Sequence, residues 1–68
     1  MTLRELWRTT KSRGQWKNFI GIYEEDDNGR PLPITPDFAD EIMETHADYI
    51  VKEHVVTPQG LLVVEFAE

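Results

Sequence analysis

Residues 49–66 read YIVKEHVVTPQGLLVVEF, and this stretch determines most of the expected fold. Two runs rich in β-forming residues, 49–56 and 61–66, flank the tetrapeptide Thr57-Pro58-Gln59-Gly60. Pro58 suits the first corner of a type I turn, and Gly60 suits the left-handed position of the bulge that follows. The sequence therefore predicts an antiparallel β-hairpin over residues 49–66.

The turn also predicts the register of this hairpin. Thr57 lies opposite Leu61, and the following pairs are Val56–Leu62, Val55–Val63, His54–Val64, Glu53–Glu65 and Lys52–Phe66. One face then carries Ile50, Lys52, His54, Val56, Leu62, Val64 and Phe66. The other face carries Tyr49, Val51, Glu53, Val55, Leu61, Val63 and Glu65. Neither face is wholly polar, so we expect both to be partly covered by helices or by another subunit.

The segment before the hairpin predicts an amphipathic helix. Thr35 suits its N-cap, Pro36 its first position, and Asp37 adds favourable charge to its first turn. At helical spacing, one arc consists of Phe38, Ala39, Ile42, Met43, His46 and Ala47. The opposite arc carries the carboxylates of Asp37, Asp40, Glu41 and Glu44. We expect the apolar arc to face the sheet, with Phe38, Ile42, Ile50, Val64 and Phe66 sharing one core.

The N-terminal third predicts a short helix and a strand. Thr2 and Glu5 have the spacing of a capping box, and a helix with Leu3, Leu6 and Trp7 on one face should end before Gly14. In the strand predicted within residues 16–24, Ile20 and Ile22 share one face, opposite Phe19, Gly21 and Tyr23. Residues 26–29 predict a turn. Residues 30–34 follow as a second strand, which Pro31 and Pro33 restrict to a sheet edge or an extended arm.

These elements predict a single domain, residues 1–68, of the α+β class. The expected architecture is a small antiparallel sheet of three to four strands, formed by two hairpins, with two short helices in the order α-β-β-α-β-β. A chain of 68 residues without cysteine cannot be stabilised by disulfides, so it depends on a compact core or on oligomerisation.

The order of patterns resembles that of small, uncharacterised accessory proteins of bacteriophages and other mobile elements of low-GC bacteria. The resemblance consists of the helical start Leu3-Arg4-Glu5-Leu6-Trp7, the strand Ile20-Gly21-Ile22-Tyr23-Glu24-Glu25-Asp26, a polar turn, a short acidic helix and a final apolar hairpin. Pro31, Pro33 and the basic stretch to Lys17 depart from it. The resemblance implies no catalytic residue.

Catalytic and metal-binding patterns are weak in this sequence. Ser12 is the only serine and has no base near it in the sequence, and no cysteine is available as a nucleophile. Glu24, Asp26, Asn28 and Gly29 match the first half of a calcium loop, but Thr35 stands where a bidentate glutamate is required. His46 and His54 are interpreted as structural residues. We therefore expect no enzymatic activity, cofactor or metal.

Charge is distributed unevenly along the chain, whose formal net charge is −6. Residues 1–20 contain five basic residues and one acid, whereas residues 21–68 contain two basic residues and twelve acids. The main hypothesis is a cytoplasmic protein-interaction module that binds a protein partner or a second copy of itself. The residues expected to bind this partner are Tyr49, Val51, Val55, Leu61 and Val63 of the sheet, and Asp37, Asp40, Glu41 and Glu44 of the helix.

Two alternatives involve nucleic acid. In the first, the chain binds a nucleic acid through a mixture of cations and stacking surfaces in its N-terminal segment. The residues that would make these contacts are Arg4, Trp7, Arg8, Lys11, Arg13, Trp16 and Lys17. In the second, the acidic helix mimics phosphates and occupies a nucleic-acid-binding protein.

Overall fold

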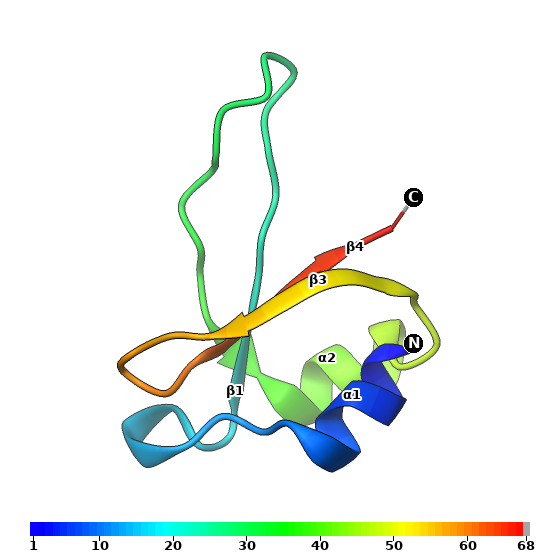
Figure 1. Cartoon of the computed structure of the whole chain (residues 1–68), viewed down its shortest axis with the longest axis vertical. Helices are drawn as coiled ribbons and strands as arrows, with labels where there is room; N and C mark the ends of the chain where they lie inside the picture. Colours follow the sequence, from blue (N-terminus) through cyan, green and yellow to red (C-terminus); the bar gives the residue numbers. More distant parts are fainter. Residues whose placement is uncertain (68) are drawn as a thin grey trace.

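The computed structural model describes residues 1–67 and confirms the α+β class. Its elements are α1 (Leu3–Thr9), the 3-10 helix η1 (Gly14–Trp16), β1 (Phe19–Ile22), β2 (Asp37–Phe38), α2 (Ala39–His46), β3 (Val51–Val56) and β4 (Leu62–Phe66). The strands form one sheet in the order β2-β1-β4-β3. Both helices pack on the same face of this sheet, while residues 23–36 extend away from it as a long arm (Figure 1).

The sheet is mixed, which corrects the expectation of a purely antiparallel sheet. β1 pairs in parallel with β4 through Ile20–Leu62, Gly21–Val63 and Ile22–Val64. Its other neighbour is the antiparallel strand β2, which lies at residues 37–38 and not at 30–34. Pro31 and Pro33 have no N–H to donate, so residues 30–34 meet the preceding limb of the arm at a single bridge, Glu25–Pro31.

The C-terminal hairpin has the predicted turn and most of the predicted register. Thr57 N donates to Leu61 O at 2.9 Å, and Gly60 has a φ of 99°. The pairs Glu53–Glu65, His54–Val64, Val55–Val63 and Val56–Leu62 are confirmed.

The pair Lys52–Phe66 is wrong, because the register shifts between Val51 and Glu53 and Phe66 pairs with Val51. This β-bulge at Lys52 moves Val51 into the core and leaves Lys52 beside Glu53 on the other face.

The core lies between the helices and the face of the sheet that carries Ile20. Its buried residues are Leu3, Leu6, Ile20, Ala39, Ile42, Val51, Leu62 and Val64, and Phe66 packs against them. The inclusion of Ile42, Val64 and Phe66 is as expected, but Phe38 and Ile50 are 53% and 51% exposed. Phe38 precedes α2 and stacks on Phe19, and Ile50 precedes the bulge and pairs with Thr2.

Both helices are shorter than their sequence patterns predict. The capping box of α1 is confirmed, since Thr2 Oγ1 accepts from Glu5 N and Thr2 N donates to the Glu5 carboxylate. This helix ends at Thr9, and Gly14 begins η1 instead. α2 begins at Ala39 and not at Pro36, because Asp37 and Phe38 are held extended by pairing with β1.

The arm, residues 23–36, continues from the end of β1 and returns to β2. Its tip is a turn as predicted, in which the Asp26 carboxylate accepts hydrogen bonds from the backbone N–H groups of Asn28 and Arg30. At its base, Ile34 lies directly over Gly21, where an added Cβ atom would be 2.7 Å from Ile34 Cγ2. Glycine at position 21 therefore allows the returning limb to pack closely on β1.

Candidate functional site

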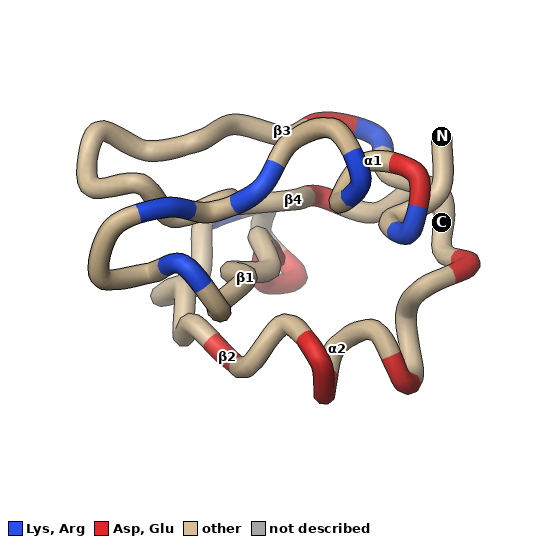
Figure 2. The backbone as a smooth tube through the Cα atoms, turned by 90° about the horizontal axis from the view of Figure 1, so that it is seen from below, with Lys and Arg blue, Asp and Glu red and all other residues tan. Residues whose placement is uncertain are grey.

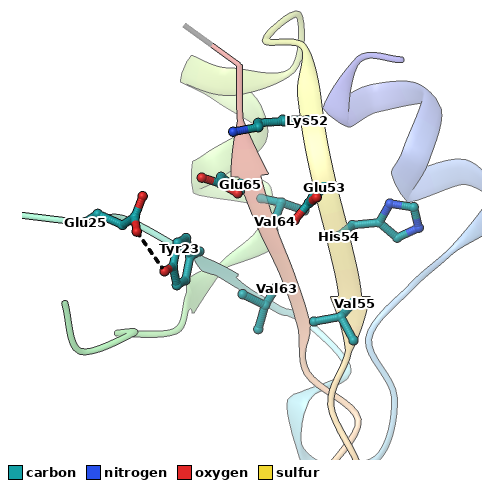
Figure 3. Close-up of a pocket in the computed structure, with 9 residues that line it drawn as sticks. All are labelled: Tyr23, Glu25, Lys52, Glu53, His54, Val55, Val63, Val64 and Glu65. Atoms are coloured by element: carbon teal, nitrogen blue, oxygen red, sulfur yellow. Dashed lines mark hydrogen bonds between the residues drawn. The ribbon is translucent and has the colours of Figure 1, made fainter. Parts of the chain in front are cut away.

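The sheet face opposite the helices, here called the open face, carries a shallow groove of about 390 Å³. The arm contributes Tyr23 and Glu25 to the groove on one side. The hairpin contributes residues 52–55 of β3 and residues 63–65 of β4 on the other (Figure 3). The parallel pairing of β1 with β4 positions these two groups of residues next to each other.

The apolar part of the groove comes from the middle of the hairpin. Val55 is 57% exposed, whereas its cross-strand partner Val63 is 7% exposed. Ile34 accounts for part of this difference, because its Cγ2 atom lies over Gly21 beside the side chains of Leu61 and Val63. The arm thus covers one half of the open face and leaves the Val55 half accessible to a partner.

Three carboxylates, those of Glu25, Glu53 and Glu65, line the same groove, against one ammonium group, that of Lys52. The only ion pair within residues 1–67 joins Arg4 to Asp48, so no described cation lies within 4.0 Å of these carboxylates. Glu53 and Glu65 are direct cross-strand neighbours, an arrangement that is destabilising for like charges. The groove therefore combines negative charge with exposed apolar surface.

Tyr23 of the arm lies next to the groove carboxylates. Its hydroxyl donates to Glu25 Oε2 at 3.3 Å. Burial raises the pKa of the Tyr23 phenol, and the charges of Glu25 and Glu65 raise it further. Tyr23 therefore remains a neutral hydrogen-bond donor at physiological pH, and its ring adds apolar surface to the wall of the groove.

His54 lies on β3 between Glu53 and Val55, but its ring points away from the groove (Figure 3). An imidazole that pairs with the two glutamates would support acid–base chemistry, and His54 is not directed toward them. His46 lies elsewhere, stacked on Phe66 with ring centroids 5.4 Å apart. The groove thus brings together carboxylates and apolar side chains, and the one histidine that lines it, His54, turns its ring away from the carboxylates.

The predicted partner-binding residues of the sheet fall into four environments. Val55 lines the groove, Val51 is in the core, and Leu61 and Val63 are buried under the base of the arm. Tyr49 is 50% exposed and packs with His46 and Phe66 in an aromatic cluster. The sequence therefore predicted more exposed apolar surface than this face has, because the bulge and the arm each remove part of it.

The acidic residues predicted to bind a partner lie away from the groove. Asp37 is in β2, and the carboxylates of Asp40, Glu41 and Glu44 are exposed on α2. A side-chain hydrogen bond with Asp37 raises the pKa of Glu41. These residues form a separate negative surface, visible along α2 in Figure 2.

The basic residues of the N-terminal segment gather on one part of the backbone (Figure 2), but their aromatic neighbours are only partly accessible. Trp7 packs against the core, and Trp16 meets Phe19 edge to face at 5.7 Å. Arg4 pairs with Asp48 at 2.6 Å. The remaining cations, Arg8, Lys11, Arg13 and Lys17, are exposed.

Neither a metal site nor a membrane span is found in the described part of the chain. Within residues 1–67, no group of three or more His, Cys, Asp or Glu side chains is arranged to hold a metal ion. Over the same residues, no helix has the length and apolar character needed to cross a membrane. The chain matches no family model, no curated protein and no solved structure.

Of the groove residues, the sequence assigned Val55 and Val63 to the site, but it assigned neither Tyr23 nor the three glutamates. The alternation of β1 placed Tyr23 on the face opposite Ile20 and Ile22, which is correct. However, nothing in the sequence indicated that β1 lies beside β4, so Tyr23 and Glu25 were not connected with Glu53 and Glu65.

Proposed function

We propose that the chain is a non-enzymatic protein-binding module that uses the groove of the open face to hold a cationic segment of a partner protein. The observation that carries this proposal is the position of Glu25, Glu53 and Glu65 around accessible Val55, with no described cation paired to them. A partner that supplies positive charge beside apolar side chains would neutralise the carboxylates and cover the valine. We also propose a cytoplasmic setting, which is supported by the absence of cysteine.

Further features support binding of a protein segment over the alternatives. The groove carboxylates repel the phosphates of a nucleic acid, and Trp7 of the basic segment is engaged with the core. Catalysis is disfavoured by the orientation of His54. A binding role is also compatible with the resemblance to phage accessory proteins, which implies no catalytic residue.

A short peptide tests the proposal. The probe is an acetylated and amidated peptide of two Lys-Thr-Val-Thr repeats, which places lysine and valine on the same face of an extended chain. We expect chemical-shift changes at Tyr23, Val55 and Glu65 in NMR spectra of the labelled chain, and none on the outer face of α2. A peptide with glutamate in place of lysine should not produce them.

A matched pair of variants separates the groove from general charge attraction. Glu65→Gln and Glu44→Gln each remove one carboxylate, but only Glu65 lines the groove. Glu65→Gln should weaken binding of the peptide about two- to fivefold, which is the range expected for the loss of one partly exposed ion pair. Glu44→Gln should leave the affinity unchanged. Equal weakening by both variants, or no shift with millimolar peptide, contradicts the proposed site.

A further inference from the structure

We infer that the partner segment binds as an added β-strand along the outer edge of β3. This inference rests on the proposed function and specifies the conformation of the partner. It begins with the sheet order β2-β1-β4-β3, which leaves β3 with one neighbouring strand. An edge strand presents unpaired backbone N–H and C=O groups that can accept another chain.

The alternation of hydrogen-bonded and non-hydrogen-bonded pairs in the hairpin identifies the backbone groups that lie on this edge. Thr57 N donates to Leu61 O, so Thr57 faces β4. In an antiparallel ladder the direction of the backbone N–H and C=O groups alternates. These groups of Val55 and Glu53 therefore point toward β4, and those of His54 and Val56 point outward. Neither His54 nor Val56 has a backbone partner outside the β3–β4 ladder within residues 1–67.

The edge is also accessible. Residues 52–55 are all exposed, in contrast to β4, where Leu62, Val63 and Val64 are buried. Helix α1 packs against α2 and the core, and residues 52–55 remain exposed beside it. This exposure is what an added strand at the edge of β3 requires.

The protein already adds an extended segment to the beginning of this edge. Thr2 forms an antiparallel bridge with Ile50, and Val51 N donates to Met1 O at 2.8 Å. This pairing ends where α1 begins at Leu3. The residues that follow in β3, 52–56, have the same edge but no such partner in the described chain.

Strand addition places the partner's side chains next to the groove. Along β3, Glu53 and Val55 point to the open face, and an added strand sets its alternate side chains beside them. A cationic side chain beside Glu53 and an apolar one beside Val55 are two positions apart in the partner. The inferred partner is therefore an extended segment with a cationic residue and an apolar residue separated by one position.

Two methylated forms of the Lys-Thr-Val-Thr peptide test strand addition. One carries N-methyl groups on its four threonines, and the other carries them on its lysines and valines. Both keep the side chains, but in a bound strand only one of these sets of N–H groups faces β3. We expect one form to bind at least about tenfold more weakly than the other, the effect of lost backbone hydrogen bonds. The unmethylated peptide should slow amide exchange at His54 and Val56.

The outcomes separate this inference from the proposed function. If both methylated forms bind as well as the parent peptide, the groove binds side chains alone and the added strand is contradicted, while the proposed function stands. If neither methylated form binds, slowed amide exchange at His54 and Val56 with the parent peptide supports the added strand. Unchanged amide exchange contradicts it. If the parent peptide does not bind, both proposals are contradicted.

Discussion

Ser12 shows how one buried polar side chain joins parts of the chain that are distant in sequence. It is 5% exposed, its hydroxyl donates to Phe19 O at 2.6 Å, and it accepts from Leu62 N at 2.8 Å. Phe19 begins β1 and Leu62 begins β4, so one hydroxyl connects the two parallel strands at the point where their pairing starts. The sequence alone shows this serine only as a nucleophile without a neighbouring base, and it does not indicate the bridging role.

Replacement of Ser12 by alanine should destabilise the protein by about 1–3 kcal/mol, because the buried Leu62 N–H then has no acceptor. The free energy of unfolding is measured by urea titration. Thr9→Ala is the matched control, since it removes a hydroxyl that lies on an exposed residue and bonds within α1. Equal effects of the two variants contradict the bridging role of Ser12.

Glu53 and Glu65 are expected to contribute to binding at a cost in stability. Replacing Glu53 by glutamine removes the cross-strand repulsion and should stabilise the fold by about 0.2–1 kcal/mol. The same variant should bind the lysine-containing peptide more weakly. Thermal unfolding and the NMR titration measure the two effects. A variant that loses stability and keeps its affinity contradicts the assignment of this pair to the site.

At the scale of elements, α1 depends on its capping box. The Thr2 backbone N–H and hydroxyl donate to the Glu5 carboxylate and hold the pKa of Glu5 below its ordinary value of 4.5. A lowered pKa in the folded state means that Glu5 stabilises the fold above pH 4.5 and that this contribution is lost as the pH falls below it.

Glu5→Gln should therefore be less stable than the parent protein at pH 7, and the difference should shrink as the pH falls below about 4.5. Both proteins keep every other carboxyl group, so the difference between them isolates Glu5. Urea titrations at pH 7 and pH 3 provide the measurement. A difference that stays constant or grows on acidification shows that the capping carboxylate is not stabilised in its charged form.

The packing of α2 against the sheet gives a second prediction at this scale. Ile42 is 5% exposed in the core, whereas Ile50 is 51% exposed. Ile42→Ala should cost about 2–4 kcal/mol, enough to unfold much of so small a protein. Ile50→Ala is the matched control and should cost less than about 1 kcal/mol. The reverse order of these effects, by urea titration or thermal unfolding, contradicts the described core.

In the molecule as a whole, the sequence predicted features that depend on residues close together in the chain. It missed features that depend on residues far apart in the chain. The turn at Pro58 and Gly60 and the capping box of Thr2 involve residues within a few positions, and both were predicted. The pairing of β1 with β4 joins residues about 40 positions apart and has no local signal. The bulge at Lys52 was missed because alternation alone gives each strand an uninterrupted period of two.

The candidate site was predicted in part for the same reason. Val55 was assigned to the site, and the Glu53–Glu65 pair follows from the turn, although the pair was not assigned to the site. Tyr23 and Glu25 belong to the arm, whose position depends on β1 and on Ile34 packing over Gly21. This tertiary contact also buries Leu61 and Val63, which alternation had assigned to an exposed surface.

We propose that the charge of the groove selects the partner, so reversing that charge should reverse the preference for the peptide. The measurement compares the Lys-Thr-Val-Thr and Glu-Thr-Val-Thr peptides by NMR titration against the parent chain and the double variant Glu53→Lys, Glu65→Lys, whose folding is checked from its spectrum. We predict that the parent chain prefers the lysine peptide and that the double variant prefers the glutamate peptide. A folded double variant that still prefers the lysine peptide would contradict selection by the charge of the groove.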